Sequence, residues 1–365
     1  MSMIQTVLGP VAPEKLGLTT MHEHVLCDVS DALAPMVKAY RAKIPTQSLA
    51  LVPENLASLR SGMSVFSQEC CPAGDVAYTV REFRAFQAMG GGCVVDASPA
   101  SMRKDLPAEM EDLREASRQS GVHVVTCTGL YVADAQPEAY KAMDEDALAA
   151  AFEADMVKGI DDQSKAGFLK CAINTLTPDG QIQPCEIKAV RACARVAAKL
   201  GASIHIHSAA PLTAEQILPV AEMVLALGVK PEKLLMLHMD SFVRRPVSDR
   251  DYIRDFAQAK TVSIDLPLRL LELGVNIGFD SWGSLIATLP EDSDRLKALV
   301  ELLRRGYGGQ ITLGHDITDK SRGVTCGYTG FTGFIRAAFP TLKELGFEQD
   351  IRKMAVENPA RILAY

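Results

Sequence analysis

The sequence predicts a single-domain α/β protein, a (β/α)8 or TIM barrel that spans residues 1–365. Three observations support this fold class: eight short apolar segments recur along the chain, amphipathic helical segments separate them, and no flexible linker or internal repeat interrupts the pattern. Strands that are apolar nearly throughout are typical of parallel sheets, because helices cover both faces of such sheets. Eight strands that alternate with helices in a chain of this length fit one closed barrel.

The predicted strands are mostly β-branched or otherwise apolar. In chain order they are residues 17–24, 93–98, 122–131, 167–174, 202–208, 234–240, 275–280 and 310–316. The carboxyl ends of the strands of such a barrel form the mouth in which active sites lie. Polar residues near those ends are therefore the candidates for function.

Helical periodicity is clearest in three of the intervening segments. Residues 187–200 are rich in Ala and Val and precede Gly201, a residue suited to a helix C-cap. Apolar faces with helical spacing also occur within residues 296–303 and 76–86, and the second helix is expected to end at glycines 90–92. The connection after the first strand, roughly residues 28–90, is a long insertion, and connections of that length are often lids or binding loops.

Composition and charge exclude several classes of protein. The net charge is -7 without a basic stripe, which argues against a nucleic-acid partner. No uncharged apolar run approaches the roughly 18 residues of a membrane span, and the first residues do not form a signal peptide. The nine cysteines include no CxxC pair and are expected to be reduced thiols in a cytoplasmic protein.

Histidines are concentrated where a barrel performs its chemistry. Six of the seven lie at or near the carboxyl end of a predicted strand. His22 and His24 are separated by one residue, so both would point into the mouth while Glu23 points the other way. Imidazole is a common ligand of divalent metals, although a hydrogen-bonded histidine pair would look the same in sequence.

Lys170 lies in an otherwise apolar predicted strand, GFLKCAIN. A buried ammonium without a partner is costly. Either an acidic residue pairs with this lysine structurally, or the site uses the lysine chemically, and the residues alone leave both readings open.

The later strands add further candidates. His205 and His207 share one face of a strand, and His207 lies nearer the mouth while His205 lies one layer deeper in the core. His238 and Asp316 come at the ends of the sixth and eighth strands, and Asp240 is expected on the same face as His238. We interpret His123 and His315 as structural, the latter facing the helices. Together these positions predict a site for two divalent metals.

Several motifs carry a resemblance that runs nearly end to end. They are TVLGPVAPEKLGLTTMHEH near the start, the lysine of the fourth strand, IHSAA, LHMD, GHD and the closing VENPARILAY. With them the sequence resembles the phosphotriesterase-related branch of the amidohydrolase superfamily. The resemblance implies an amidohydrolase-type barrel and a metal-dependent hydrolase.

The resemblance also implies a ligand set. His22, His24 and Asp316 would bind the more buried metal, and His207 and His238 would bind the more exposed metal. Lys170 would carry an N6-carboxylate that bridges the two ions. A metal-bridging hydroxide would be the nucleophile, and Asp316 would accept its proton. Zinc fits these ligands, and manganese, cobalt or iron also remain open.

The resemblance bears on the substrate as well. Tyr131 occupies a position at which lactonase-like relatives have a tyrosine, which favours a carboxylic ester or lactone. The phosphotriesterases have a histidine after the seventh strand, whereas this chain has Ser281, so their proton relay and efficient phosphotriester hydrolysis are in doubt. An amidase for a small N-acyl compound, a phosphotriesterase side activity and a non-catalytic ligand-binding homologue are the alternatives.

Two cations follow Asp316 on the loop after the eighth strand. Lys320 and Arg322 would bind an anionic part of the substrate at the barrel rim, or they belong to an ordinary solvated loop. The expected partner is therefore a small-molecule substrate, with neither nucleic acid nor membrane involved, and a homodimer is left open.

Overall fold

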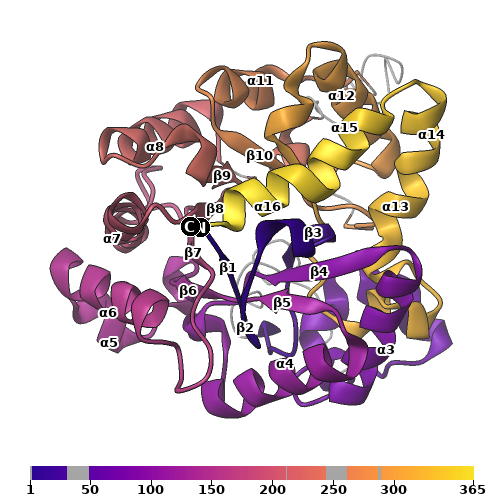
Figure 1. Ribbon diagram of the computed structural model, residues 1–365, viewed down its shortest axis with the longest axis horizontal. Helices are drawn as coiled ribbons and strands as arrows, with labels where there is room; N and C mark the ends of the chain where they lie inside the picture. Colours follow the sequence, from indigo (N-terminus) through magenta and orange to yellow (C-terminus); the bar gives the residue numbers. More distant parts are fainter. Residues whose placement is uncertain (1, 31–48, 211, 244–260, 287–288) are drawn as a thin grey trace.

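The computed structural model describes residues 2–30, 49–210, 212–243, 261–286 and 289–365, and these form a TIM barrel (Figure 1). Every predicted strand is present, and the strands of the barrel pair in parallel. Their bounds are β3 Leu18–Glu23, β4 Gly91–Asp96, β5 His123–Val125, β6 Cys127–Gly129, β7 Phe168–Ala172, β8 Ile204–His207, β9 Leu234–Met236, β10 Asn276–Phe279 and β11 Ile311–Leu313. The predicted third strand is thus divided into β5 and β6.

Backbone hydrogen bonds close the barrel between its first and last strands. The amide of Asp316 donates to the carbonyl of His22 over 3.0 Å, and the amide of His24 donates to the carbonyl of Ile317 over 3.1 Å. On the opposite side, β7 and β8 pair with Lys170 beside His205. This register places candidate ligands from distant parts of the sequence around one mouth.

Helices surround the strands, as Figure 1 shows. They begin and end largely where the sequence predicts; α7 ends at Leu200 with Gly201 at φ 69°, the left-handed conformation expected of a glycine C-cap. The helices are α2 Leu56–Ser58, α3 Val76–Ala88, α4 Leu106–Ser120, α5 Glu138–Ala142, α6 Glu145–Val157, α7 Pro184–Leu200, α8 Ala214–Ala226, α11 Asp265–Glu272, α12 Asp292–Arg304, α13 Gly333–Ala337, α14 Phe339–Glu344, α15 Glu348–Arg352 and α16 Asn358–Leu363.

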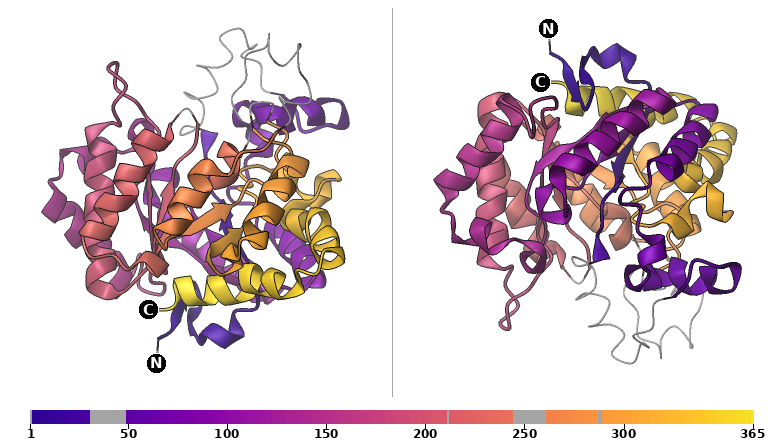
Figure 2. Two further views of the ribbon diagram at one scale, coloured as in Figure 1. Left: turned by 90° about the horizontal axis from the view of Figure 1, so that it is seen from above. Right: turned by 90° about the horizontal axis from the view of Figure 1, so that it is seen from below.

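The end of the barrel opposite the mouth is covered by both ends of the chain. A hairpin that the sequence did not predict, β1 (Ile4–Thr6) with β2 (Gly9–Val11), lies there beside α16 (Figure 2). Met3 and Tyr365 exchange backbone hydrogen bonds of 3.2 and 3.1 Å. Ile4 and Leu363 are buried with apolar residues of the barrel strands, so the hairpin and α16 complete one core.

The structure corrects the predicted end of α3 and describes only part of the insertion after the first strand. Gly91 and Gly92 belong to β4 and do not end α3. A Cβ at Gly92 would lie 2.5 Å from the carbonyl oxygen of Leu16, so close approach of the backbone explains the glycine. The insertion after the first strand is present as short helical turns before α3, and its residues 31–48 lie outside the described part of the chain.

Candidate active site

The structure brings all six predicted metal ligands together at the mouth of the barrel. His22 lies in β3 and His24 directly follows it, while Lys170 and His207 extend from β7 and β8. His238 and Asp316 follow β9 and β11. Both adopt a left-handed backbone conformation, with φ of 60° and 52°. Such values are uncommon for residues other than glycine and cluster at functional sites.

The first part of the cluster is formed by His22, His24 and Asp316. Asp316 Oδ1 lies 3.2 Å from His24 Nε2 and 3.7 Å from His22 Nε2. His22 is fully buried, whereas the side chain of Asp316 keeps 32% of its surface exposed. Burial and the charge of Lys170 lower the pKa of His22 to about 3, so this imidazole is neutral and offers a lone pair to a cation.

Lys170 is fully buried beside this group, with Nζ 3.1 Å from His22 Nε2. Within the described residues no carboxylate lies at ion-pair distance from it, so the structural reading of an acid-paired lysine is not supported. Burial lowers the pKa of Lys170 to about 8 despite the nearby charge of Asp316. A larger fraction of this amine is therefore neutral near neutral pH than for an exposed lysine, and a neutral amine is the form that reacts with carbon dioxide.

His207 and His238 form the second part of the cluster. His238 Nε2 lies 2.8 Å from His207 Nδ1, and the two rings meet edge to face with centroids 4.4 Å apart. His207 Nε2 is buried without a hydrogen-bond partner among the described residues. Burial holds the pKa of His207 well below its usual value. A neutral imidazole with an unsatisfied ring nitrogen, beside a second imidazole, has the donor chemistry of a metal site.

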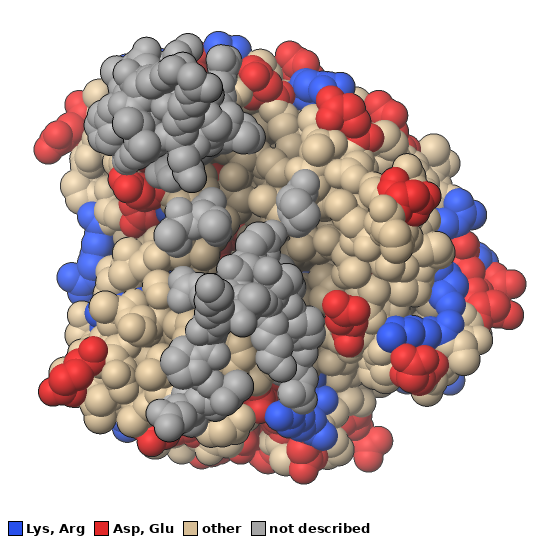
Figure 3. All heavy atoms as spheres, turned by 180° about the vertical axis from the view of Figure 1, so that it is seen from behind, with Lys and Arg blue, Asp and Glu red and all other residues tan. Residues whose placement is uncertain are grey.

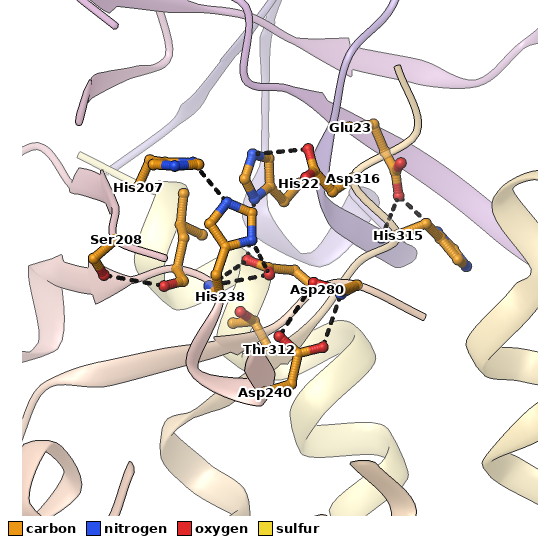
Figure 4. A network of polar contacts seen from close by, with 12 residues as sticks. His22, Glu23, His207, Ser208, His238, Asp240, Asp280, Thr312, His315 and Asp316 are labelled. Carbon is orange, nitrogen blue, oxygen red and sulfur yellow. Dashed lines mark hydrogen bonds and ion pairs between the residues drawn. The ribbon is translucent and has the colours of Figure 1, made fainter. Parts of the chain in front are cut away.

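Asp280 joins the two parts, and sequence reasoning did not single it out. Its Oδ2 accepts from His22 Nδ1 over 3.0 Å, and its Oδ1 accepts from His238 Nδ1 over 2.9 Å (Figure 4). Burial alone would raise the pKa of Asp280, but electrostatic interaction with His238 and His22, including a hydrogen bond from each, holds it well below its usual value. Its position as the last residue of the predicted seventh strand was the available signal.

Asp240 does not share the orientation of His238 that strand alternation predicted. The left-handed conformation of His238 ends the alternation, and Met239–Phe242 form a 3-10 turn. The buried Asp240 carboxylate instead accepts from Arg295 Nε over 2.8 Å and from the backbone amide of Ser281 over 2.9 Å. Asp240 and Ser281 are therefore tied to α12.

The remaining histidines lie away from the ligand cluster. His315 Nδ1 donates to Glu23 Oε1 over 2.6 Å, and its ring stacks on Phe334, so Glu23 and His315 face outward as predicted. His205 lies below the mouth, fully buried and stacked on Phe168 with centroids 4.2 Å apart. His123 begins β5 and is half-buried.

A cavity of about 300 Å³ opens over the cluster, and that size suits a small molecule. Asp316, His24, His207 and His238 line its floor, and Val65, Met102, Ile286 and Leu289 supply apolar walls. On the face opposite the chain termini, charged side chains gather mostly at the periphery of the described surface (Figure 3). Tyr131 also lines the cavity, and its ring contacts His207 edge to face at 5.1 Å.

The two predicted rim cations have different surroundings. Lys320 Nζ forms an ion pair with Asp75 Oδ2 at 3.2 Å and is not among the residues that line the cavity, which does not support a contact between Lys320 and substrate. Arg322 does line the cavity, but its Nη1 and Nη2 donate to backbone carbonyls of Asp316, His315 and Trp282.

Arg60 is a cavity-lining cation that sequence reasoning missed. It lies in the insertion after β3 and donates to the carbonyls of Ser321 and Cys326, and its guanidinium lies 4.5 Å from the ring centroid of Tyr328. No carboxylate of the described residues lies at ion-pair distance from Arg60 or Arg322, whose hydrogen bonds go to backbone carbonyls, although Asp316 and Asp319 line the same cavity.

Comparison with known proteins identifies a family and several relatives that match nearly the whole chain. A family model described as "Phosphotriesterase family" matches residues 2–363. N-acetyltaurine hydrolase of Tetraodon nigroviridis is 28% identical over 373 residues, which cover 99% of this chain and 98% of that protein. A phosphotriesterase-related protein of Drosophila melanogaster is 24% identical over 379 residues, covering 100% and 99%.

Solved structures share the fold. A resiniferatoxin-binding protein from Rhodobacter sphaeroides matches with a TM-score of 0.78 and 23% identity, covering 99% of this chain and 94% of that one. A lactonase from Listeria monocytogenes matches with a TM-score of 0.71 and 21% identity, covering 99% and 98%. At these identities the structural likeness establishes the barrel.

Proposed function

This chain belongs to the phosphotriesterase family, and on that premise we propose that it is a binuclear-metal-dependent hydrolase of a small carboxylic ester or lactone. The observation that carries the proposal is the cluster at the mouth. Three histidines and a carboxylate line one cavity, and beside them the fully buried Lys170 lies 3.1 Å from His22 without a carboxylate at ion-pair distance among the described residues.

The residues fit the metals that the family implies. His22, His24 and Asp316 would hold one ion, His207 and His238 would hold the other, and a carboxylated Lys170 would bridge them. The orphaned Nε2 of His207 and the buried amine without a carboxylate partner are the features that such a filling explains. When bound, divalent metals would polarise the substrate carbonyl and lower the pKa of a nucleophilic water. Zinc suits the mixture of imidazole and carboxylate, with manganese, cobalt or iron as alternatives.

Asp316 is the proton acceptor in this proposal. Burial would raise its pKa, but His22 and a hydrogen bond from His24 hold that pKa well below the usual value, so the carboxylate is ionised at neutral pH. Its partial exposure toward the cavity lets it take a proton from an attacking water. The Tyr131 hydroxyl has no hydrogen-bond partner among the described residues and can donate to the oxygen that becomes negative during acyl transfer.

The size and the lining of the cavity restrict the class of substrate that it can bind. Its size admits a small acyl compound, and its apolar wall suits an alkyl or acyl chain. The guanidiniums of Arg60 and Arg322, which form no ion pair with a carboxylate of the described residues, favour a substrate with an anionic group. This chain has Ser281 near the place where phosphotriesterases have their relay histidine, so phosphotriester cleavage would be at most a side activity.

Hydrolysis of an N-acyl amide is the second candidate, and a specific observation favours it. The N-acetyltaurine hydrolases match this chain over 99% of its length. N-acetyltaurine carries a small acetyl group at one end, joined by an amide bond, and an anionic sulfonate at the other end. The cavity of this protein offers an apolar wall for such an acyl group and two guanidiniums for such an anion. Ester and amide hydrolysis pass through the same kind of tetrahedral intermediate, so one set of residues serves either reaction.

The experiment is a substrate screen with matched bonds. The zinc-loaded protein is tested on γ-lactones, linear esters, N-acetyl amino sulfonates, N-acetyl amino acids and a phosphotriester, with Asp316→Asn as the control. We expect two metal ions per chain and the highest kcat/KM on a lactone or ester. A preference for the N-acyl compounds would establish the second candidate. Absence of turnover on every carbonyl compound with both ions bound would favour a ligand-binding protein without catalysis.

A further inference from the structure

We propose that Asp280 is a positioning residue that orients one histidine of each metal site, so that a single carboxylate determines which ring nitrogens face the ions. The inference rests on the proposed function, because it concerns how this chain presents its ligands. Asp280 follows β10, a strand that supplies none of the six predicted ligands.

The contacts of Asp280 reach both halves of the cluster. Oδ2 lies 3.0 Å from Nδ1 of His22, and Oδ1 lies 2.9 Å from Nδ1 of His238. The backbone amide of His238 also donates to Oδ1 over 3.0 Å and to Oδ2 over 3.2 Å. Figure 4 shows Asp280 below the imidazoles of His238 and His22, on the side away from Asp316 and His207.

These distances determine where the protons lie. An ionised carboxylate only accepts hydrogen bonds, so the Nδ1 atoms of His22 and His238 must each carry a proton. In the neutral form of each ring, which is the form that binds a metal, the lone pair is then at Nε2. Nε2 of His22 faces Lys170 and Asp316, and Nε2 of His238 faces His207. Hydrogen bonding at one ring nitrogen thereby sets the nitrogen available to a metal.

The local sequence makes room for this carboxylate. A Cβ at Gly278 would lie 2.4 Å from Asp280 Oδ2, so the glycine two residues earlier leaves the space into which the carboxylate folds. Asp280 is only 1% exposed, and water therefore does not compete for its hydrogen bonds. The carboxylate is held by its partners in one orientation.

His24 offers a contrast within the same cluster. Its Nδ1 lies 2.8 Å from Ser98 Oγ, a hydroxyl that can either donate or accept. Ser98 therefore does not select a tautomer for His24, whereas Asp280 does so for His22 and His238. Ser98→Ala is accordingly a matched control for removal of a neighbour from a ligand.

Asp280→Asn tests the proposal because asparagine has one acceptor oxygen and one donor nitrogen. Two His238 donors meet at Oδ1, so the amide oxygen is expected there and the amide nitrogen is expected to face His22. His22 must then accept at Nδ1 and carry its proton on Nε2, where it cannot bind a metal. In Asp280→Asn we expect the zinc affinity of the buried site, formed by His22, His24 and Asp316, to fall 10- to 100-fold. Ser98→Ala should change that affinity by less than about threefold. Asp280→Ala should weaken both sites.

The measurements are zinc titration against a competing chelator and 15N NMR of the histidine side chains. In the wild-type protein we expect Nδ1–H tautomers for both His22 and His238 with and without zinc. This result needs no variant and tests the proposal even if Asp280→Ala does not fold. An Nε2–H tautomer at either residue, or an unchanged buried-site affinity in Asp280→Asn, would overturn the inference. A wild-type protein that binds fewer than two zinc ions would instead contradict the proposed function.

Discussion

Replacing Lys170 with methionine should stabilise the metal-free protein while removing its function. The pKa of this lysine falls from 10.5 to about 8 because burial disfavours the charged form. A difference of about 2.5 pKa units, at 1.36 kcal/mol each, corresponds to about 3 kcal/mol. At pH 7 the folded protein bears this penalty in full, and methionine fills a similar volume without a charge.

The pH dependence has a definite sign. Between about pH 8 and 10.5 the unfolded chain keeps the Lys170 proton that the folded protein has lost, so the stability of the wild-type protein rises with pH relative to the variant. The difference should therefore be about 3 kcal/mol in favour of Lys170→Met at pH 7 and should vanish near pH 10.5. Comparison of the two proteins at each pH cancels the titration of the shared groups that do not interact with Lys170.

Urea unfolding of the chelator-treated proteins in buffer free of carbon dioxide measures this difference. Lys233→Met is the matched control, because the pKa of Lys233 is also lowered to about 8. Lys233, however, donates to the carbonyls of Arg361, Ile362 and Ala364. Loss of these charge-assisted bonds should make that variant less stable. The reasoning about Lys170 is refuted if Lys170→Met is less stable than the wild-type protein at pH 7, or if the difference does not shrink as the pH rises.

Three further predictions concern individual residues at the mouth. His207→Ala should lose the second metal and reduce kcat/KM by more than about 100-fold, whereas His205→Ala should retain both metals and lose about 2 kcal/mol or more of stability; metal analysis that shows the reverse would mean that their roles are exchanged. Tyr131→Phe should lower kcat about 100-fold with metal content unchanged, and an unaltered kcat would remove Tyr131 from the reaction. Arg60→Met should raise KM about tenfold or more for anionic substrates and leave neutral ones unchanged, while Lys320→Met should affect neither; equal losses on both substrate classes would assign Arg60 a purely structural role.

Much of the fold could be predicted from the sequence because both faces of every barrel strand must be buried. That requirement produces short apolar segments such as residues 202–208 and 275–280, which local reading detects. Within these apolar segments His207 and Lys170 are conspicuous, because burial of a polar side chain is costly unless the side chain is hydrogen-bonded or paired. The unpredicted hairpin β1–β2 is different, because its role depends on contact with α16 at the other end of the chain.

The sequence by itself determined the order of the strands and, with the family resemblance, the six candidate ligands. Only the tertiary structure decided which side chains orient these ligands and which acid pairs with the predicted rim cation Lys320. Asp280 reaches His22 across 258 positions of sequence, and Lys320 pairs with Asp75 across 245. Alternation also stops being informative where His238 takes a left-handed conformation, so Asp240 turns toward Arg295. The physical reason is that burial along a strand is a local property of the chain, whereas hydrogen bonds and ion pairs between side chains depend on distances that closure of the barrel creates.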